Sequence, residues 1–171
     1  WPKRTPMRAL IPAALLIATA LPALADVVEN DVIKVFDGKW VQSKDPSQNG
    51  ILMYLTQERS SVGEYFSVRC DGAEPSVRVA YPKRHSAKDI GLTVDGVEQR
   101  VPAEFTGKTK DPHFLKGNVF GYALKFEDAA ARDAFLQGLA QGRMLTVEGQ
   151  SLPVELAGSA QALREQAGYC K

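Results

Sequence analysis

Short runs of alternating apolar and polar residues, separated by turn-forming pairs, constrain the fold of this chain more than any other feature of its sequence. Two clear examples are residues 64–70 and 76–81. Because successive side chains of a strand point to opposite faces, each run can bury one face and expose the other. The expected buried sets are Phe66, Val68 and Cys70 in the first run and Val77, Val79 and Tyr81 in the second, which leaves Tyr65, Ser67, Arg69, Ser76, Arg78 and Ala80 on the opposite face.

The same pattern recurs along most of the chain and predicts a mainly β protein. The turn-forming pair Asp95-Gly96 is the strongest hairpin signal, because Asp-Gly adopts the positive φ angles of a two-residue type I′ turn. We therefore expect an antiparallel, sandwich-like domain of about nine strands. These strands are residues 33–42, 51–57, 64–70, 76–81, 91–95, 98–104, 118–126, 143–148 and 152–157.

Two short helices are expected in the last third of the chain, which makes the domain α+β by content. The first spans residues 128–140, where Asp128 suits the N-cap, apolar residues recur at helical spacing and Gly142 is a stop signal. The second spans residues 159–167, with Ser159 as its expected N-cap.

Residues 1–25 are interpreted as an upstream remnant followed by a secretory signal peptide. Arg8 supplies a positive n-region, residues 10–21 an apolar h-region, and Ala-Leu-Ala at 23–25 a small-x-small cleavage site. The apolar run is shorter than the roughly 20 residues of a spanning helix, so a retained membrane anchor is the less favoured alternative. We expect cleavage to leave residues 26–171 as a single β-rich domain, periplasmic or secreted by Gram-negative export, with no membrane span.

Cleavage also changes the charge of the protein. The formal net charge falls from +1 to −2, because the removed segment holds Lys3, Arg4 and Arg8 and no acidic residue. This balance gives no support for binding to nucleic acid or to an anionic membrane. The densest basic cluster, residues 83–88, is interpreted as a solvated loop in preference to a specific anion site.

The two cysteines, Cys70 and Cys170, predict a disulfide, because an even pair in an exported chain favours oxidation. The bridge would close a loop of about 100 residues, for which the chain-entropy model gives on the order of 4–5 kcal/mol. A redox-active role is the alternative, but no CxxC spacing supports it.

The polar, turn-rich stretch at residues 106–117 is the longest predicted loop, and loops of this length often carry function. Phe114 has two interpretations, as an anchor to the core or as a residue offered to a partner. The candidate partner-binding residues in this stretch are Lys108, Lys110, Asp111, His113 and Phe114.

Catalytic and metal-binding motifs are not apparent in the sequence. His85 and His113 are the only histidines, and they lack the HExxH spacing of a zinc site. Ser159 lacks the second glycine of a GxSxG nucleophile elbow. The Gly-Lys-Thr at 107–109 lacks the upstream glycine of a phosphate loop. We therefore expect no enzyme, no cofactor and no metal ion.

The chain resembles two groups of small exported proteins. It is similar to the invasion-associated locus B family of alphaproteobacterial envelope proteins in the segments GKWV at 38–41, LTVDG at 92–96, FLQGLAQGRM at 135–144 and LAGSAQAL at 156–163. It resembles the periplasmic accessory family associated with type VI secretion in pairing Arg69-Cys70 with the Ala-Leu-Arg at 162–164 and Cys170. The chain departs from the first family in carrying only one distant cysteine pair.

The resemblance implies an envelope β-sandwich that binds a partner and catalyses nothing. The expected function is therefore a periplasmic accessory or binding protein, invasion- or secretion-associated, that acts through protein–protein contact in the cell envelope. An inhibitor of a hydrolase, such as a lysozyme or a protease, is an alternative that would insert the loop at 106–117 into an active site. A small envelope hydrolase is a second alternative, which would require a pocket that gathers acidic or histidine side chains. The identity of the partner and the oligomeric state are left open.

Overall fold

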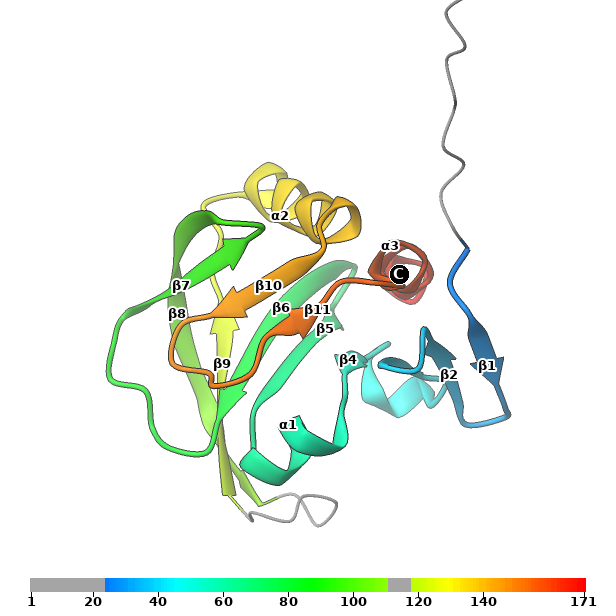
Figure 1. Cartoon of the computed structure of the whole chain (residues 1–171), viewed down its shortest axis with the longest axis horizontal. Helices are drawn as coiled ribbons and strands as arrows, with labels where there is room; N and C mark the ends of the chain where they lie inside the picture. Colours follow the sequence, from blue (N-terminus) through cyan, green and yellow to red (C-terminus); the bar gives the residue numbers. More distant parts are fainter. Residues whose placement is uncertain (1–23, 111–117) are drawn as a thin grey trace, which may run out of the picture.

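Eleven antiparallel strands form one curled sheet in the computed structural model, which describes residues 24–110 and 118–171 (Figure 1). The strand order is β1-β2-β3-β4-β5-β6-β9-β8-β7-β10-β11. The strands are β1 (Val27–Glu29), β2 (Ile33–Phe36), β3 (Trp40–Ser43), β4 (Leu52–Tyr54), β5 (Tyr65–Asp71), β6 (Glu74–Tyr81), β7 (Asp89–Val94), β8 (Val97–Lys110), β9 (Asn118–Leu124), β10 (Met144–Val147) and β11 (Val154–Glu155), and the helices are η1 (Pro46–Gln48), α1 (Gln57–Val62), α2 (Ala129–Gln141) and α3 (Ser159–Ala167).

Strand β8 connects the two layers of the fold. Its first half pairs with β7 and its second half pairs with β9. Strands β10 and β11 continue the sheet beyond β7 and cross in front of β5 and β6 in Figure 1. The mainly β, antiparallel, α+β expectation is confirmed, and the sandwich-like layering comes from a single sheet that folds over itself.

The core lies between these layers and beneath α2 and α3. Trp40, Leu52 and Phe66 from the first layer and Leu92 and Leu145 from the second are completely buried in it. Each such side chain stabilises the fold by roughly 1.5–3 kcal/mol relative to exposure. The helices close the core with Phe135 and Leu139 from α2 and Ala162 and Leu163 from α3.

A buried polar network connects the layers at the α1 end. The Arg59 guanidinium, 1% exposed, donates to the carbonyls of Leu152 and Pro153 at 2.6 and 3.1 Å and to the side chain of Gln150. The Glu64 carboxylate accepts from Ser151 N–H at 2.6 Å and from Leu152 N–H at 3.1 Å. Burial lowers the pKa of Arg59, and the nearby Glu64 charge opposes that shift. The turn between β10 and β11 is thereby fixed against the first layer.

The two predicted helices are present, and one predicted cap is wrong. Asp128 caps α2 by accepting from Ala131 N–H at 2.7 Å. Helix α3 instead begins after Gly158, whose φ is +81°, and the hydroxyl of Ser159 donates to the Leu139 carbonyl at 2.8 Å. Ser159 therefore connects α3 to α2 rather than capping its own helix.

Two of the expected strands are interrupted in the structure. The run at 33–42 is divided into β2 and β3 by a turn at Asp37 and Gly38, both with positive φ. Helix α1 begins inside the run expected as a strand at 51–57, because Thr56 caps it by accepting from Arg59 N–H at 3.2 Å. The hairpin at Asp95-Gly96 is confirmed, with φ of +47° and +87°.

The predicted disulfide between Cys70 and Cys170 is confirmed, with a sequence separation of 100 residues. It joins the end of β5 to the segment after α3, and its presence is compatible with an extracytoplasmic location. In the part of the chain that the structure describes, no helix combines the length and apolar character needed to cross a membrane.

Candidate functional site

A β-bulge in β8 determines which side chains gather at the candidate site. Phe105 pairs with Tyr122 and Gly107 with Gly121, so Thr106 is an extra residue on the β8 side. Gly107 adopts a φ of +135°, which favours glycine over other residues. The extra residue reverses the alternation, so that Lys108 and Lys110 lie on the same face as Phe105.

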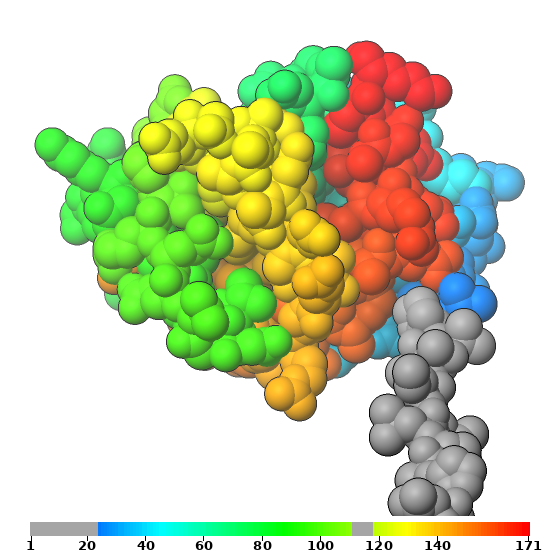
Figure 2. All heavy atoms as spheres, turned by 90° about the horizontal axis from the view of Figure 1, so that it is seen from above, coloured from blue at the N-terminus to red at the C-terminus, as the bar shows by residue number. Residues whose placement is uncertain are grey.

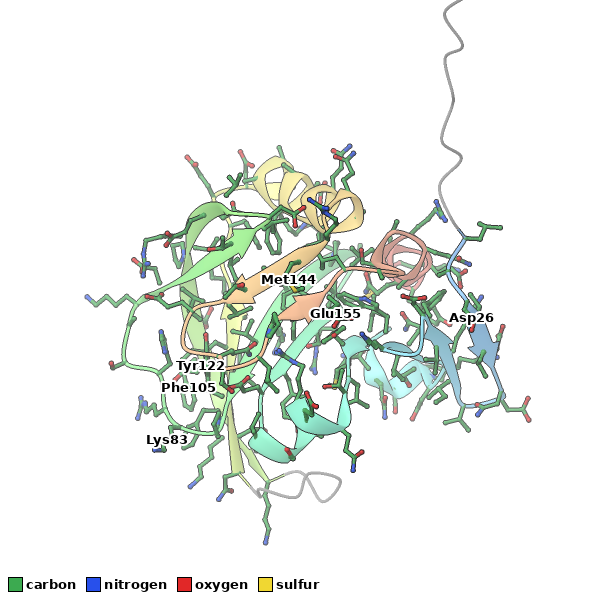
Figure 3. The ribbon with its side chains drawn as sticks, in the orientation of Figure 1. Asp26, Lys83, Phe105, Tyr122, Met144 and Glu155 are labelled. Carbon is green, nitrogen blue, oxygen red and sulfur yellow. A yellow bond between two sulfur atoms is a disulfide. The ribbon has the colours of Figure 1, made fainter. Side chains whose placement is uncertain are left out.

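This face is the core face of the sheet at the end farthest from α2 and α3. Figure 3 shows Phe105 and Tyr122 close together there, with Lys83 nearby on the loop that follows β6. Phe105 is 40% exposed, and its ring centroid lies 5.4 Å from that of Tyr122 and 6.4 Å from that of Phe120. The aromatic core therefore continues to the surface at this end.

Two cations lie over the rings of Phe105, which is exposed, and Phe120, which is half-buried. The Arg84 guanidinium carbon is 5.0 Å from the centroid of Phe105, and Lys108 Nζ is 5.6 Å from the centroid of Phe120. Both distances are within the range of cation–π attraction, which contributes about 0.5–1 kcal/mol at exposed sites. We call Arg84, Phe105, Lys108, Lys110 and Phe120 the basic-aromatic surface.

The loop that carries Arg84 is fixed by aromatic side chains. The Tyr122 hydroxyl accepts from His85 N–H and donates to the His85 carbonyl, both at 2.9 Å. The His85 ring stacks on Tyr81 with centroids 4.9 Å apart. Tyr81 donates its hydroxyl to the Glu148 carbonyl at 2.8 Å, and burial raises its pKa. His85 therefore has a packing role in this structure.

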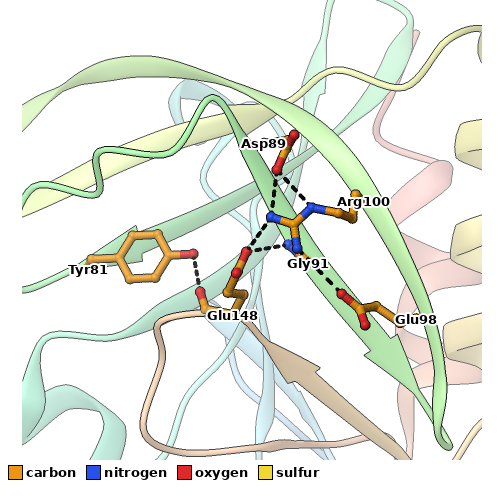
Figure 4. A network of polar contacts seen from close by, with 6 residues as sticks. All are labelled: Tyr81, Asp89, Gly91, Glu98, Arg100 and Glu148. Atoms are coloured by element: carbon orange, nitrogen blue, oxygen red, sulfur yellow. Dashed lines mark hydrogen bonds and ion pairs between the residues drawn. The ribbon is translucent and has the colours of Figure 1, made fainter.

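The far end of the same loop leads into an ionic network on β7 and β8 (Figure 4). Arg100 contacts Asp89 at 2.6 Å and Glu148 at 2.9 Å, and these hydrogen bonds raise the pKa of Arg100. Glu148 also accepts from Gly91 N–H at 2.9 Å, and this bond, followed by the one from Arg100, lowers the pKa of Glu148. The network thereby neutralises Arg100.

The cations of the basic-aromatic surface have no acidic partner within residues 24–110 and 118–171. Arg84, Lys108 and Lys110 make no ion pair there, whereas the neighbouring Lys125 pairs with Glu104 at 2.9 Å. A concentration of positive charge beside one exposed and one half-buried aromatic ring suits an acidic ligand surface.

The structure brings together some of the residues predicted from the sequence. Lys108 and Lys110 lie in β8, not in a loop, because residues 106–110 continue the pairing with β9. Asp111, His113 and Phe114 fall outside the described residues. The sequence prediction missed Arg84, Phe105 and Phe120, which come from three different elements. The glycine at 107, inside a strand-like run, was the available signal for a bulge.

A separate groove of about 520 Å³ lies between α2 and the hairpin of β7 and β8. Figure 2 shows α2, yellow to orange, between this green hairpin and the red α3. Val97, 75% exposed, Ala134 and Gly138 contribute to its apolar lining. The lining of this groove contains no cluster of acidic or histidine side chains. In the described part of the chain, no three His, Cys, Asp or Glu side chains are grouped so that they could bind a metal ion.

Comparison with models of protein families, with curated proteins and with solved structures finds no match for this chain. The geometry of its own residues therefore carries the functional argument.

Proposed function

We propose that this protein is an exported accessory protein of the cell envelope that binds an acidic protein partner through the basic-aromatic surface, and that it is not an enzyme. The bulge at Thr106 is the observation that carries the proposal. It turns Lys108 and Lys110 to the face on which Phe105 is exposed and Arg84 lies. Cationic and aromatic residues that are far apart in the sequence thus form one surface.

The composition of this surface is that of a protein-binding site. Aromatic residues and arginine are enriched where binding energy concentrates in interfaces. Unpaired cations accelerate encounter with an acidic partner and disfavour basic ones. Because Tyr122 fixes the loop that carries Arg84, little conformational entropy is lost when a partner binds.

Two further features support the cellular location in this proposal. Residues 1–25 have the three parts of a secretory signal, and the disulfide between Cys70 and Cys170 belongs to proteins of oxidising compartments. A bacterial periplasm or the extracellular space is such a compartment.

The test is recovery of a partner by the mature, oxidised protein from an envelope extract at low and high salt. We expect one stoichiometric protein, lost at high salt, and at least tenfold weaker recovery by the double variant Arg84→Glu/Lys108→Glu. The matched control is Arg164→Glu on α3, which reverses an exposed charge away from the surface and should retain the partner.

Two results would overturn the proposal. The first is equal recovery by the double variant and the control, which would place binding elsewhere. The second is failure to recover any stoichiometric protein together with turnover of a peptidoglycan or ester substrate, which would make the protein an enzyme.

A further inference from the structure

Two neighbouring arginines, Arg69 on β5 and Arg78 on β6, lie on the outer face of the sheet. In the antiparallel pairing, Ser67 is opposite Arg78 and Arg69 is opposite Ser76. The intervening Val68 is completely buried in the core, so all four of these polar side chains project from the other face. The two guanidinium groups therefore share one diagonal of the sheet, with a serine beside each.

Neither arginine makes an ion pair or a side-chain hydrogen bond in the described residues. Their Nε atoms are fully removed from solvent and make no hydrogen bond there. Buried polar groups are nearly always satisfied, and an exception in a folded protein requires an explanation. Other buried atoms of the described residues share this state, including Arg59 Nε and Trp40 Nε1, but Arg69 and Arg78 place two such guanidinium groups on adjacent strands.

The other arginines with little exposure show what compensation looks like in this protein. The terminal nitrogens of Arg59 donate to two carbonyls and a side-chain amide, although its Nε has no partner in the described residues. Arg132 pairs with Glu74 at 2.8 Å and with Asp133 at 2.9 Å. Lys125 pairs with Glu104 at 2.9 Å and lowers the pKa of that carboxylate, and the charge of Arg78 lowers the same pKa further. The Glu104 carboxylate is therefore already neutralised by Lys125. The diagonal of Arg69 and Arg78 is thus left with excess positive charge.

The electrostatic environment of Arg69 favours the binding of an anion. Burial lowers its pKa, and the like charge of Arg78 lowers it further. An anion placed between the two groups would reverse both effects, because it supplies the opposite charge and hydrogen-bond acceptors for the donors that lack them.

Space for a ligand is present beside Arg69. A hollow of about 530 Å³ lies over β3, β4 and the segment around η1, with Arg69 on its wall. Ser43, Ser47 and Asn49 contribute polar groups to the lining. Its acidic side chain, Asp45, is turned onto Ser47 N–H at 2.9 Å as the cap of η1.

We propose that Arg69 and Arg78 form a binding site for a tetrahedral dianion of the phosphate or sulfate class. Two guanidinium groups offer two positive charges and forked donors, which match the charge and the several oxygens of such an anion. The hydroxyls of Ser67 and Ser76, in register with the arginines, complete the donor set. The site lies on the outer face, opposite to the basic-aromatic surface, and does not depend on the function proposed above.

The experiment is a titration of the mature, oxidised protein with inorganic phosphate at constant ionic strength, followed by the Nε–H resonances of its arginines in NMR spectra. We expect saturable shifts confined to Arg69 and Arg78. Arg69→Gln and Arg78→Gln should each weaken binding at least tenfold, while Arg164→Gln on α3 should bind as the unmodified chain does. Phosphate should also raise the melting temperature of the unmodified chain and not that of Arg69→Gln.

The inference is wrong if the two Nε–H resonances do not respond to phosphate, or if chloride at the same ionic strength gives the same shifts. Because these resonances report the site in the unmodified chain, the result does not depend on whether a variant folds. Arg69→Lys adds a further discrimination, since it keeps the charge but removes the fork. If this substitution leaves the phosphate affinity unchanged, the attraction is non-specific and electrostatic, and no defined binding site is present.

Discussion

Removal of the disulfide by the double substitution Cys70→Ala/Cys170→Ala should cost several kcal/mol of stability. The bridge closes a loop with a sequence separation of 100 residues. For a loop of this length the chain-entropy model gives about 4.7 kcal/mol, which arises because the cross-link restricts the unfolded chain. A domain with a free energy of unfolding of about 5–15 kcal/mol would lose a large fraction of its stability.

The folded state itself should change little in this variant. Helix α3 remains packed through Ala162 and Leu163, which are buried in the core. Gln166 also donates to the Gly50 carbonyl at 3.2 Å, independently of the sulfur atoms. The loss should therefore come mainly from a more expanded unfolded chain.

Urea unfolding followed by the fluorescence of buried Trp40 measures both effects. We expect the free energy of unfolding to fall by about 4–5 kcal/mol and the m-value to rise, because an unfolded chain without the cross-link exposes more surface. The unmodified protein in reductant is the matched control and should show the same loss. A loss below about 1 kcal/mol with an unchanged m-value would refute the loop-entropy reasoning.

Three further perturbations test other parts of the structure. Arg59→Met should lower the free energy of unfolding, measured by urea titration, by about 3–5 kcal/mol, because it leaves buried acceptors and the Glu64 charge uncompensated. A loss under about 1 kcal/mol would show that Arg59 does not hold the two layers together. Tyr122→Phe should cost about 1–3 kcal/mol and accelerate hydrogen exchange at the His85 amide, whereas unchanged exchange would show that the hydroxyl does not fix the loop. Glu148, whose folded-state pKa lies below its ordinary value of 4.5, stabilises the fold above that pH and loses this contribution as the pH falls through the lower folded value. Glu148→Gln should therefore flatten the acid limb of a stability–pH curve, and an unaltered curve would exclude this contribution.

The features predicted correctly from the sequence are those with a local physical cause. Burial of Phe66 and Val68 followed from alternation, and the hairpin at Asp95-Gly96 followed from backbone preference. Helix α2 followed from a capping residue and helical spacing. In each case the deciding interaction spans only a few residues, so the local sequence contains it.

The features that were missed depend on contacts between distant segments. The hydroxyl of Ser159 bonds to Leu139 on another helix, which no local pattern reveals. Thr106 is the extra residue of a bulge only because β9 pairs on either side of it. Within residues 24–110 and 118–171, the lack of an ion pair for Arg69 and Arg78 likewise depends on every element around them, and composition cannot show it.

The distribution of ion pairs explains how a chain with almost balanced charge can present two positive surfaces. The lysines of β2 and its neighbours are neutralised locally: Lys34 pairs with Glu165 at 2.6 Å and Lys44 with Glu29 at 2.8 Å. In the described residues, most of the cations without an ion pair fall instead between positions 69 and 110, on the outer face of β5 and β6 and around β8. Because attraction of a ligand depends on the local field and not on the net charge, this segregation allows acidic groups to be attracted to both surfaces. Both proposed sites should therefore weaken with ionic strength, although the net charge alone predicts no such dependence.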